Sequence, residues 1–452
     1  MKRYTMICSA LAALSMPAFA AVSADEAKQL GTTLTEFGAI KAGNKEGTIP
    51  AYTGGLTKAP AGYKAGSGFW ADPFKDEKPL FRIDAKNAAQ YADKLSEGQK
   101  LLLKKYPASY HIDIYPSHRT AAFPDKVLKA TVRNATGCKT LKDNLAVDIA
   151  CRGGLPFPIP KNGYEAMWNM QLAYAGEMGT TTEMSRSWVV DSGGKVTMTA
   201  EQSTVQEKPY YQTGDRDEQM YSRAFSVTRG PSRRAGEASG LLDYLDPTDK
   251  PRRAWSYTPG QRRVKLAPEF AYDTPVSSQG GVTLFDELFL FSGKMDRFDF
   301  KLVGKKEMYI PYNGYKYYFE CKEDDQFRPQ HVNPECERHE LHRVWVVEAT
   351  LKPGMRHVYS KRVYFIDEDA PNAGMFDAFD QSGALYRSSF ISFVQLYDAT
   401  VPYAVKNAVY DFNKGMYALL NDSLSKGYQI PKTMRSEREQ NAEAVVARSS
   451  AR

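Results

Sequence analysis

Two segments in the C-terminal half of the chain are predicted strands with apolar side chains on both faces. In residues 342–351, Val344 and Val346 fall on one face and Trp345 on the other, and residues 357–367 alternate in the same way. Successive side chains of a strand point to opposite faces, so such strands are buried on both sides. We therefore expect a β structure in which one sheet face meets a core and the other a cavity or a covering helix.

Turn residues predict further strands as hairpins. Residues 187–200 contain two strand-like runs around Ser-Gly-Gly-Lys, and residues 253–266 contain two around Pro-Gly. A strand is also predicted at 315–321, and helices are predicted at about 85–105 and 163–174. The 28 tyrosines and 22 phenylalanines agree with a mainly β fold, because aromatic residues are enriched in strands.

The first twenty residues have the pattern of a secretory signal peptide. Lys2 and Arg3 precede a short apolar run, and an Ala-Phe-Ala site ends at Ala20. We predict cleavage after Ala20 and export to the periplasm of a Gram-negative cell, with association with the outer membrane as a further expectation.

The remaining chain divides by composition. Residues 21–80 are rich in Gly and Pro and are expected to extend over the main domain. Residues 81–430 are predicted to form that domain. Residues 431–452 are charged and small without periodicity, which predicts a disordered tail.

The charge of the chain is mildly basic. The formal net charge of +7 falls to about +5 without Lys2 and Arg3. This charge permits weak contact with an anionic membrane surface. It is far from the concentrated basic patch of a nucleic-acid-binding protein, and we expect no nucleic-acid partner.

Four cysteines follow the predicted cleavage site. They allow three pairings, and their spacing favours Cys138 with Cys151 and Cys321 with Cys336. Each bridge would close a loop of about 15 residues and stabilise the fold by about 3 kcal/mol. The rival interpretation is a metal site at Cys336 with three histidines. An exported chain without a C-x-x-C pair favours disulfides.

No motif of a known catalytic centre is present in the sequence. The chain lacks a phosphate-binding loop, a dinucleotide glycine fingerprint, an H-E-x-x-H helix and a G-x-S-x-G elbow, so we predict no enzyme, no cofactor and no metal. His331, His339 and His342 form the strongest metal alternative, and a polar connection is the favoured interpretation of residues 331–342. Residues 367–369, Asp-Glu-Asp, could bind calcium, but a solvated turn at the end of a strand is favoured.

Two groups of residues are candidates for a binding site. The predicted hairpin around Pro259 gathers four arginines that could contact lipid headgroups or a partner, or pair with carboxylates: Arg252, Arg253, Arg262 and Arg263. Aromatic residues crowd the same part of the chain and could line an apolar cavity. The candidates for the cavity wall are Trp255, Tyr257, Phe289, Phe291, Phe298 and Trp345.

Several stretches resemble an uncharacterised bacterial envelope family, domain-of-unknown-function family 1329. They are GTIP (47–50) with Gly-Gly (54–55), GLPFP (154–158), RAWSYTPGQRRV (253–264), DRFDFKLVGKKEM (296–308), ELHRVWVVEA (340–349) and YSKR (359–362). None is a catalytic signature, and together they span nearly the whole mature chain.

This resemblance implies a fold and a class of function. The family is similar to the lipoprotein carriers LolA and LolB, which implies a large curved antiparallel sheet forming an incomplete half-barrel, with helices covering the open side. It also implies a carrier of a lipid or another hydrophobic molecule, accessory to a resistance–nodulation–division-type exporter and an outer-membrane protein. The alternatives are a structural envelope protein that acts by protein–protein contact, and a metal-dependent hydrolase that uses residues 331–342.

Overall fold

One open sheet of 15 strands organises the chain, in a computed structural model that describes residues 22–212, 217–433 and 435–450. The predicted signal peptide lies outside the described residues. In spatial order the strands are β1 (Phe81–Ile83), β2 (Ile112–Ile114), β12 (His339–Leu351), β13 (Lys361–Asp367), β14 (Gly374–Phe379), β15 (Leu385–Ile391), β18 (Asn407–Asp411), β19 (Met416–Asp422), β5 (Thr180–Val190), β6 (Val196–Glu207), β7 (Met220–Gly230), β8 (Ala238–Tyr244), β9 (Arg253–Thr258) and β10 (Arg263–Leu266).

The remaining elements are short or lie beside this sheet. β11 (Phe298–Pro311) pairs with β12 off the main path, while β3 (Thr140–Leu141) pairs with β4 (Ala146–Val147) and β16 (Val394–Leu396) with β17 (Val401–Tyr403). The α-helices of the described chain are α1 (Ala24–Ala27), α2 (Glu97–Lys105), α3 (Asp125–Gly137), α4 (Gly163–Gln171) and α5 (Ala442–Ser450).

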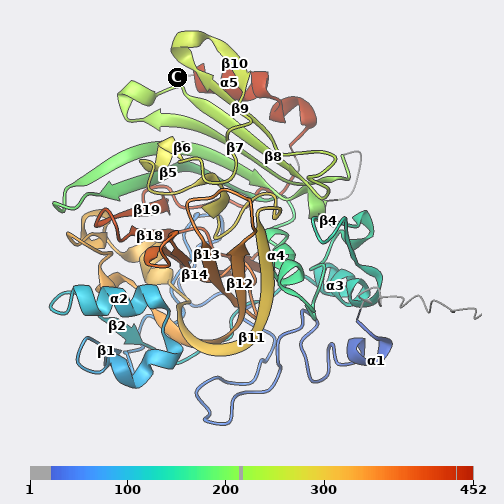
Figure 1. The fold of residues 1–452 in the computed structure, drawn as a ribbon, viewed down its shortest axis with the longest axis vertical. Coiled ribbons are helices and arrows are strands. Elements are labelled where there is room, and N and C mark those ends of the chain that lie inside the picture. The colour runs from blue at the N-terminus through green and yellow to red at the C-terminus, as the bar shows by residue number, and fades with distance from the viewer. Residues whose placement is uncertain (1–21, 213–216, 434, 451–452) are drawn as a thin grey trace, which may run out of the picture.

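The sheet ends at β1 and β10 and does not close into a barrel. Its neighbours are antiparallel except for β2 and β12, which pair in parallel through one position. The prediction of a mainly β fold with a large, incompletely closed sheet and few helices is therefore confirmed. Figure 1 shows β5 to β10 as one curved layer and β11 to β15 as a second region of the molecule.

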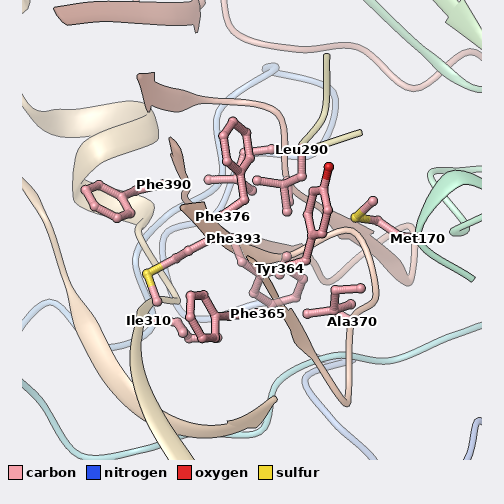
Figure 2. Packing of buried hydrophobic residues seen from close by; sticks show 14 of the residues in the cluster. Met170, Leu290, Ile310, Tyr364, Phe365, Ala370, Phe376, Phe390 and Phe393 are labelled. Carbon is pink, nitrogen blue, oxygen red and sulfur yellow. The ribbon is translucent and has the colours of Figure 1, made fainter. Parts of the chain in front are cut away.

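Strands that are apolar on both faces do lie in the core. On β13, Tyr364 is fully buried and Phe365 is 8% exposed. Figure 2 shows Tyr364 beside Leu290 and Met170, and Phe365 beside Ile310. Met170 belongs to α4, which packs on β11 and β12. This half of the sheet is thus covered by a helix and a loop.

Local predictions succeeded where turn chemistry was clear. Both predicted hairpins form, with β5 pairing with β6 and β9 with β10. The predicted helix at 85–105 divides into a 3-10 helix, Ala88–Lys94, and α2, because Ser96 and Gln99 form a new capping box between them. The predicted strand at 315–321 is wrong, since Lys316–Glu320 forms a π-helical turn whose tyrosines are buried.

The two described ends of the chain differ in secondary structure and pack in different apolar clusters. Residues 22–80 contain little regular structure, yet Phe37, Ile49 and Trp70 join the main core cluster. Within the C-terminal segment for which disorder is predicted, the structure describes the helix α5. Val445 is 1% exposed and packs in a separate cluster with Phe225 and Trp255, on the strands β7 and β9. This apolar contact stabilises α5, a helix that the pattern of its own sequence does not predict.

Both predicted disulfides are present, Cys138–Cys151 and Cys321–Cys336. The rival metal site is wrong because Cys336 is bonded to Cys321. In the described part of the chain no helix is long and apolar enough to cross a membrane.

Candidate ligand-binding site

A cavity of about 650 Å³ lies between the strands β5 to β9 and the segment 270–289, which we call the covering segment. Side chains from five neighbouring strands form one wall. The covering segment and residues of β17, β19 and the chain after β19 form the other side. Arg233, Thr258 and Ser277 line it and are exposed to solvent, so they mark its rim.

The sheet wall of the cavity is mainly polar, and its side chains are uncharged. It is formed by the alternate side chains of each strand that point away from the α5 side. The residues are Thr180, Thr182, Ser185, Gln202, Thr204, Gln206, Ala224, Ser226, Thr228, Ser239, Leu241, Ser256 and Thr258. Side chains of the opposite set, such as Val227 and Trp255, pack against α5. Hydroxyl and amide groups can donate and accept hydrogen bonds, so this wall suits a ligand with polar groups.

The opposite side supplies the large apolar side chains of the cavity, together with the polar residues Ser277, Ser278, Gln279 and Asn421. Phe270, Val276, Phe285, Leu288 and Phe289 come from the covering segment, and Tyr403, Val405 and Tyr428 complete it. The cavity therefore has a hydrogen-bonding side and a side of aromatic and aliphatic groups.

The covering segment turns sharply at its end. Phe289 and Leu290 have φ angles of 55° and 74°, in the left-handed region that bulky residues rarely adopt. The turn places Phe289 in the cavity wall, while Leu290 is fully buried in the main core. Figure 2 shows Leu290 beside Tyr364. Core packing of Leu290 therefore fixes the position of the cavity residue before it.

A buried ion pair anchors the covering segment to β13. Oδ2 of Asp286 accepts a hydrogen bond from Arg362 at 2.6 Å and lies 3.0 Å from Nε2 of His357. Burial acts to raise the pKa of Asp286, but the positive charge of Arg362 and the hydrogen bonds from His357 and Arg362 outweigh it and lower the pKa to about 2. Asp286 is therefore a carboxylate at neutral pH.

A second buried carboxylate anchors the same segment to β15. Glu287 accepts hydrogen bonds from Arg387, at 3.0 Å, and from the hydroxyl of Tyr359. Arg387 also reaches Asp411 on β18 at 3.2 Å. The cover contains two 3-10 turns and no α-helix, and it is held to the packed half of the sheet by charge.

A smaller cavity of about 70 Å³ adjoins the first and shares lining residues with it, including Phe289 and Tyr403. Lys208 lines it and donates to the carbonyl of Gln171 at 3.0 Å. Burial lowers the pKa of Lys208 to about 8, against the opposing effect of Asp243. This corner is the part of the site where a cation would meet a ligand.

The predicted cavity aromatics are divided by the structure. Phe289 lines both cavities and Phe291 lines the small one. Tyr257 contacts the large cavity but also packs against the cluster on the α5 side. Trp255 packs on the α5 side, Phe298 is buried beside His357, and Trp345 lies under the ammonium of Lys305. These last three line neither cavity.

The four arginines of the predicted basic cluster have different roles. Arg252 has a side chain that is 10% exposed, and it pairs with Asp243 at 2.7 Å. It also donates to Ser292, so it holds structure rather than a headgroup. Arg253 on β9, Arg263 on β10 and Arg262 in the turn between them are exposed at the end of the sheet.

The residues of the metal alternative are also separated. His331 bonds to Ser109, and His339 is 3% exposed, while His342 lies between Glu340 and Asp367. Nδ1 of His342 is 3.5 Å from Asp367, and Asp369 completes a buried group of three potential ligands.

The favoured interpretation of residues 367–369 as a solvated turn is wrong, because all three are buried. Arg119 holds Asp369 with two hydrogen bonds of 2.7 Å. Burial and the neighbouring Asp369 raise the pKa of Asp367 well above its usual value. The guanidinium of Arg119 on Asp369 opposes a second cation there.

The sequence analysis did not identify the polar wall of the cavity, although the sequence contains a pattern that indicates it. In residues 222–228, Ser222, Ala224, Ser226 and Thr228 alternate with larger residues. Small polar side chains facing a covered region indicate a wet cavity wall. That region could not be identified before the covering segment was placed.

Comparisons with known proteins agree on one relationship. The family model described as "Protein of unknown function (DUF1329)" matches residues 82–445. An uncharacterised protein of Pseudomonas aeruginosa is 40% identical over 416 residues, covering 91% of this chain and 90% of the relative.

Solved structures show weaker likeness. A DUF1329 family protein from Desulfovibrio piger has a TM-score of 0.43 and 13% identity, covering 63% of this chain and 97% of that one. A LolA superfamily protein from Nitrosomonas europaea has a TM-score of 0.35 and 10% identity, covering 63% and 99%.

Proposed function

The chain belongs to the DUF1329 family, and from that premise we propose that it binds a lipid or another largely hydrophobic molecule in the large cavity. Membership confirms the resemblance identified in the sequence. The observation that carries the proposal is the cavity itself. Its volume of about 650 Å³ falls in the range of small-molecule sites.

The physical basis is transfer of apolar surface out of water. Rings and aliphatic groups of the covering segment would contact the apolar part of the ligand, which is stabilised by about 25 cal/mol for each Å² buried. The buried ion pairs of Asp286 and Glu287 hold the segment in place, so the site is formed before the ligand arrives. No step of this function requires catalysis.

The proposed setting is the periplasm, where the protein would act as a carrier or accessory to an exporter or an outer-membrane partner. The predicted signal peptide and the two disulfides support this setting, because disulfides persist in oxidising compartments.

Native mass spectrometry of the protein purified from a Gram-negative periplasm tests the proposal, followed by solvent extraction. A hydrophobic compound bound at near-equal stoichiometry is expected. Ala224→Phe places a ring in the cavity and should abolish binding of the compound. Thr197→Phe, the control, adds the same ring at an exposed position of β6 and should leave binding unchanged. Protein that is empty, and remains empty with envelope lipids, would contradict ligand binding.

A second function is favoured by one surface. Arg253, Arg262, Arg263 and Lys265 are exposed at the end of the sheet, and Leu266 on the edge strand β10 is 70% exposed. This surface suits docking to an anionic membrane or to a protein partner. Arg262→Glu with Arg263→Glu should weaken sedimentation with anionic vesicles. Unchanged sedimentation would remove the headgroup role of these two arginines.

A further inference from the structure

A row of hydroxyl groups crosses the polar wall of the cavity. The strand registers pair Thr182 with Thr204, Thr204 with Ser226, Ser226 with Ser239, and Ser239 with Ser256. All five residues line the large cavity. We call them the hydroxyl row.

The row is regular because of sheet geometry. Residues that face each other on neighbouring strands place their side chains on the same face, and their Cβ atoms lie roughly 5 Å apart. Five such positions on β5 to β9 therefore present hydroxyls at nearly equal intervals along one line.

Most of the row lacks partners within the protein. The hydroxyl of Thr182 bonds to Ser423 and to the carbonyl of Gly427. Across the described ranges of the chain, no hydrogen bond engages the hydroxyls of Thr204, Ser226, Ser239 or Ser256. These four side chains are only partly buried, so their hydroxyls are open to the cavity.

An unbranched alkyl chain cannot form hydrogen bonds with the hydroxyl groups of this wall. It would displace water from the hydroxyls and return no hydrogen bonds, which is unfavourable. A ligand with several hydroxyls of its own would replace the lost water contacts, since each side-chain hydroxyl can donate once and accept twice.

The row itself carries no charge, because its side chains are hydroxyls and the amides beside it are neutral. At the rim, Arg234 and Glu237 form an ion pair of 2.8 Å, and Arg233 is exposed to solvent. Opposite the row, Phe270 and Phe289 offer ring faces and edges to apolar groups.

We propose that the cavity takes a polyhydroxylated amphiphile of the glycolipid class, with sugar hydroxyls on the hydroxyl row and apolar groups against the covering segment. This inference rests on the proposed function and narrows its ligand.

Titration with octyl glucoside, 1-octanol and glucose tests the inference, because the first combines the groups that the others carry separately. Octyl glucoside should bind roughly tenfold more tightly than 1-octanol, as expected for two or more added hydrogen bonds. Ser226→Ala and Ser239→Ala should each weaken octyl glucoside binding by roughly three- to fivefold and leave 1-octanol binding unchanged. Ser192→Ala, in the exposed turn between β5 and β6, is the matched control and should change neither.

The other outcomes separate this inference from the function on which it rests. Equal binding of octyl glucoside and 1-octanol, unaffected by the serine variants, would overturn the hydroxyl row as a ligand site and leave a hydrophobic carrier standing. If glucose binds as tightly as octyl glucoside, the ligand needs no apolar part, and the proposal of an amphiphile is overturned. Failure of all three probes, with a lipid retained in native mass spectrometry, would overturn the glycolipid class alone. Failure of the probes with empty protein would overturn both proposals.

Discussion

Asp286 of the covering segment and Arg362 of β13 form an ion pair of 2.6 Å that is almost completely buried. It joins the wall of the cavity to the packed half of the sheet. The position of the cover therefore depends on electrostatics inside the core.

Removing one partner of this pair should be costly. Asp286→Asn leaves Arg362 charged and buried, and we expect a loss of about 3–5 kcal/mol in the free energy of unfolding, measured with urea. Asp217→Asn breaks the exposed pair with Lys250 and should cost about 1 kcal/mol or less. Equal losses in the two variants would contradict an anchoring role for Asp286.

The same carboxylate predicts a dependence on acid. The pKa of Asp286 is lowered to about 2, so its contribution is fully present above pH 4 and is lost as the pH falls through 2. In acid titrations, wild type and Asp286→Asn should therefore converge in stability toward pH 2. A constant difference down to pH 2 would contradict this assignment.

His339 predicts a second effect of pH with a different window. It is 3% exposed, and burial lowers its pKa to about 4. Between pH 6.5 and 4 the unfolded chain takes up a proton that the folded chain does not, so stability falls as pH falls. From pH 7 to 5 the loss should be about 2 kcal/mol greater in wild type than in His339→Gln. Parallel profiles of stability against pH for the two proteins would refute this role of His339.

The disulfide between Cys138 and Cys151 should contribute measurably to stability. Replacing both residues by Ala should lower the free energy of unfolding by about 3 kcal/mol, because the bridge restricts the unfolded chain. Reducing this double variant with dithiothreitol should lower its free energy of unfolding further, because Cys321–Cys336 is then opened. When Cys321 and Cys336 are also replaced by Ala, the reductant should have no effect. Calorimetry with and without reductant measures both.

The docking of α5 depends on Val445. Val445→Asp puts a charge against Phe225 and Trp255, and the helix should detach. Trp255 should then become more accessible to acrylamide quenching, and the C-terminus should be cleaved sooner by trypsin. Ala447→Asp, at an exposed position of the same helix, should leave both measurements unchanged.

Much of the fold could be predicted from local chemistry. The turns at Gly193 and Pro259 specified hairpins, and the apolar alternation around Val344 specified buried strands. Cysteine spacing favoured both bridges over the other pairings. Each of these signals acts within about 20 residues along the chain, where few arrangements compete.

The site was less predictable, for reasons that individual residues make plain. Trp255 is aromatic and lies on a strand of the cavity wall, yet it faces α5, because neighbouring residues on a strand face opposite sides. Its neighbour Ser256 faces the cavity instead. Arg252 and Asp286 carry charges that normally mark a surface. Arg252 instead pairs with Asp243 of the neighbouring strand β8, and Asp286 is buried with Arg362, 76 residues later in the chain.

The sequence by itself determined the class of fold, the hairpins, the two disulfides and the family, because these depend on local patterns or on many matched stretches. Only the tertiary structure decided which face of β5 to β9 meets the covering segment, and hence that the cavity has a hydroxyl wall. That choice depends on contacts between β7 and α5, and between Asp286 and Arg362, which lie 76 residues apart in the chain. No local propensity encodes contacts of this kind, since they form only when the whole sheet is assembled.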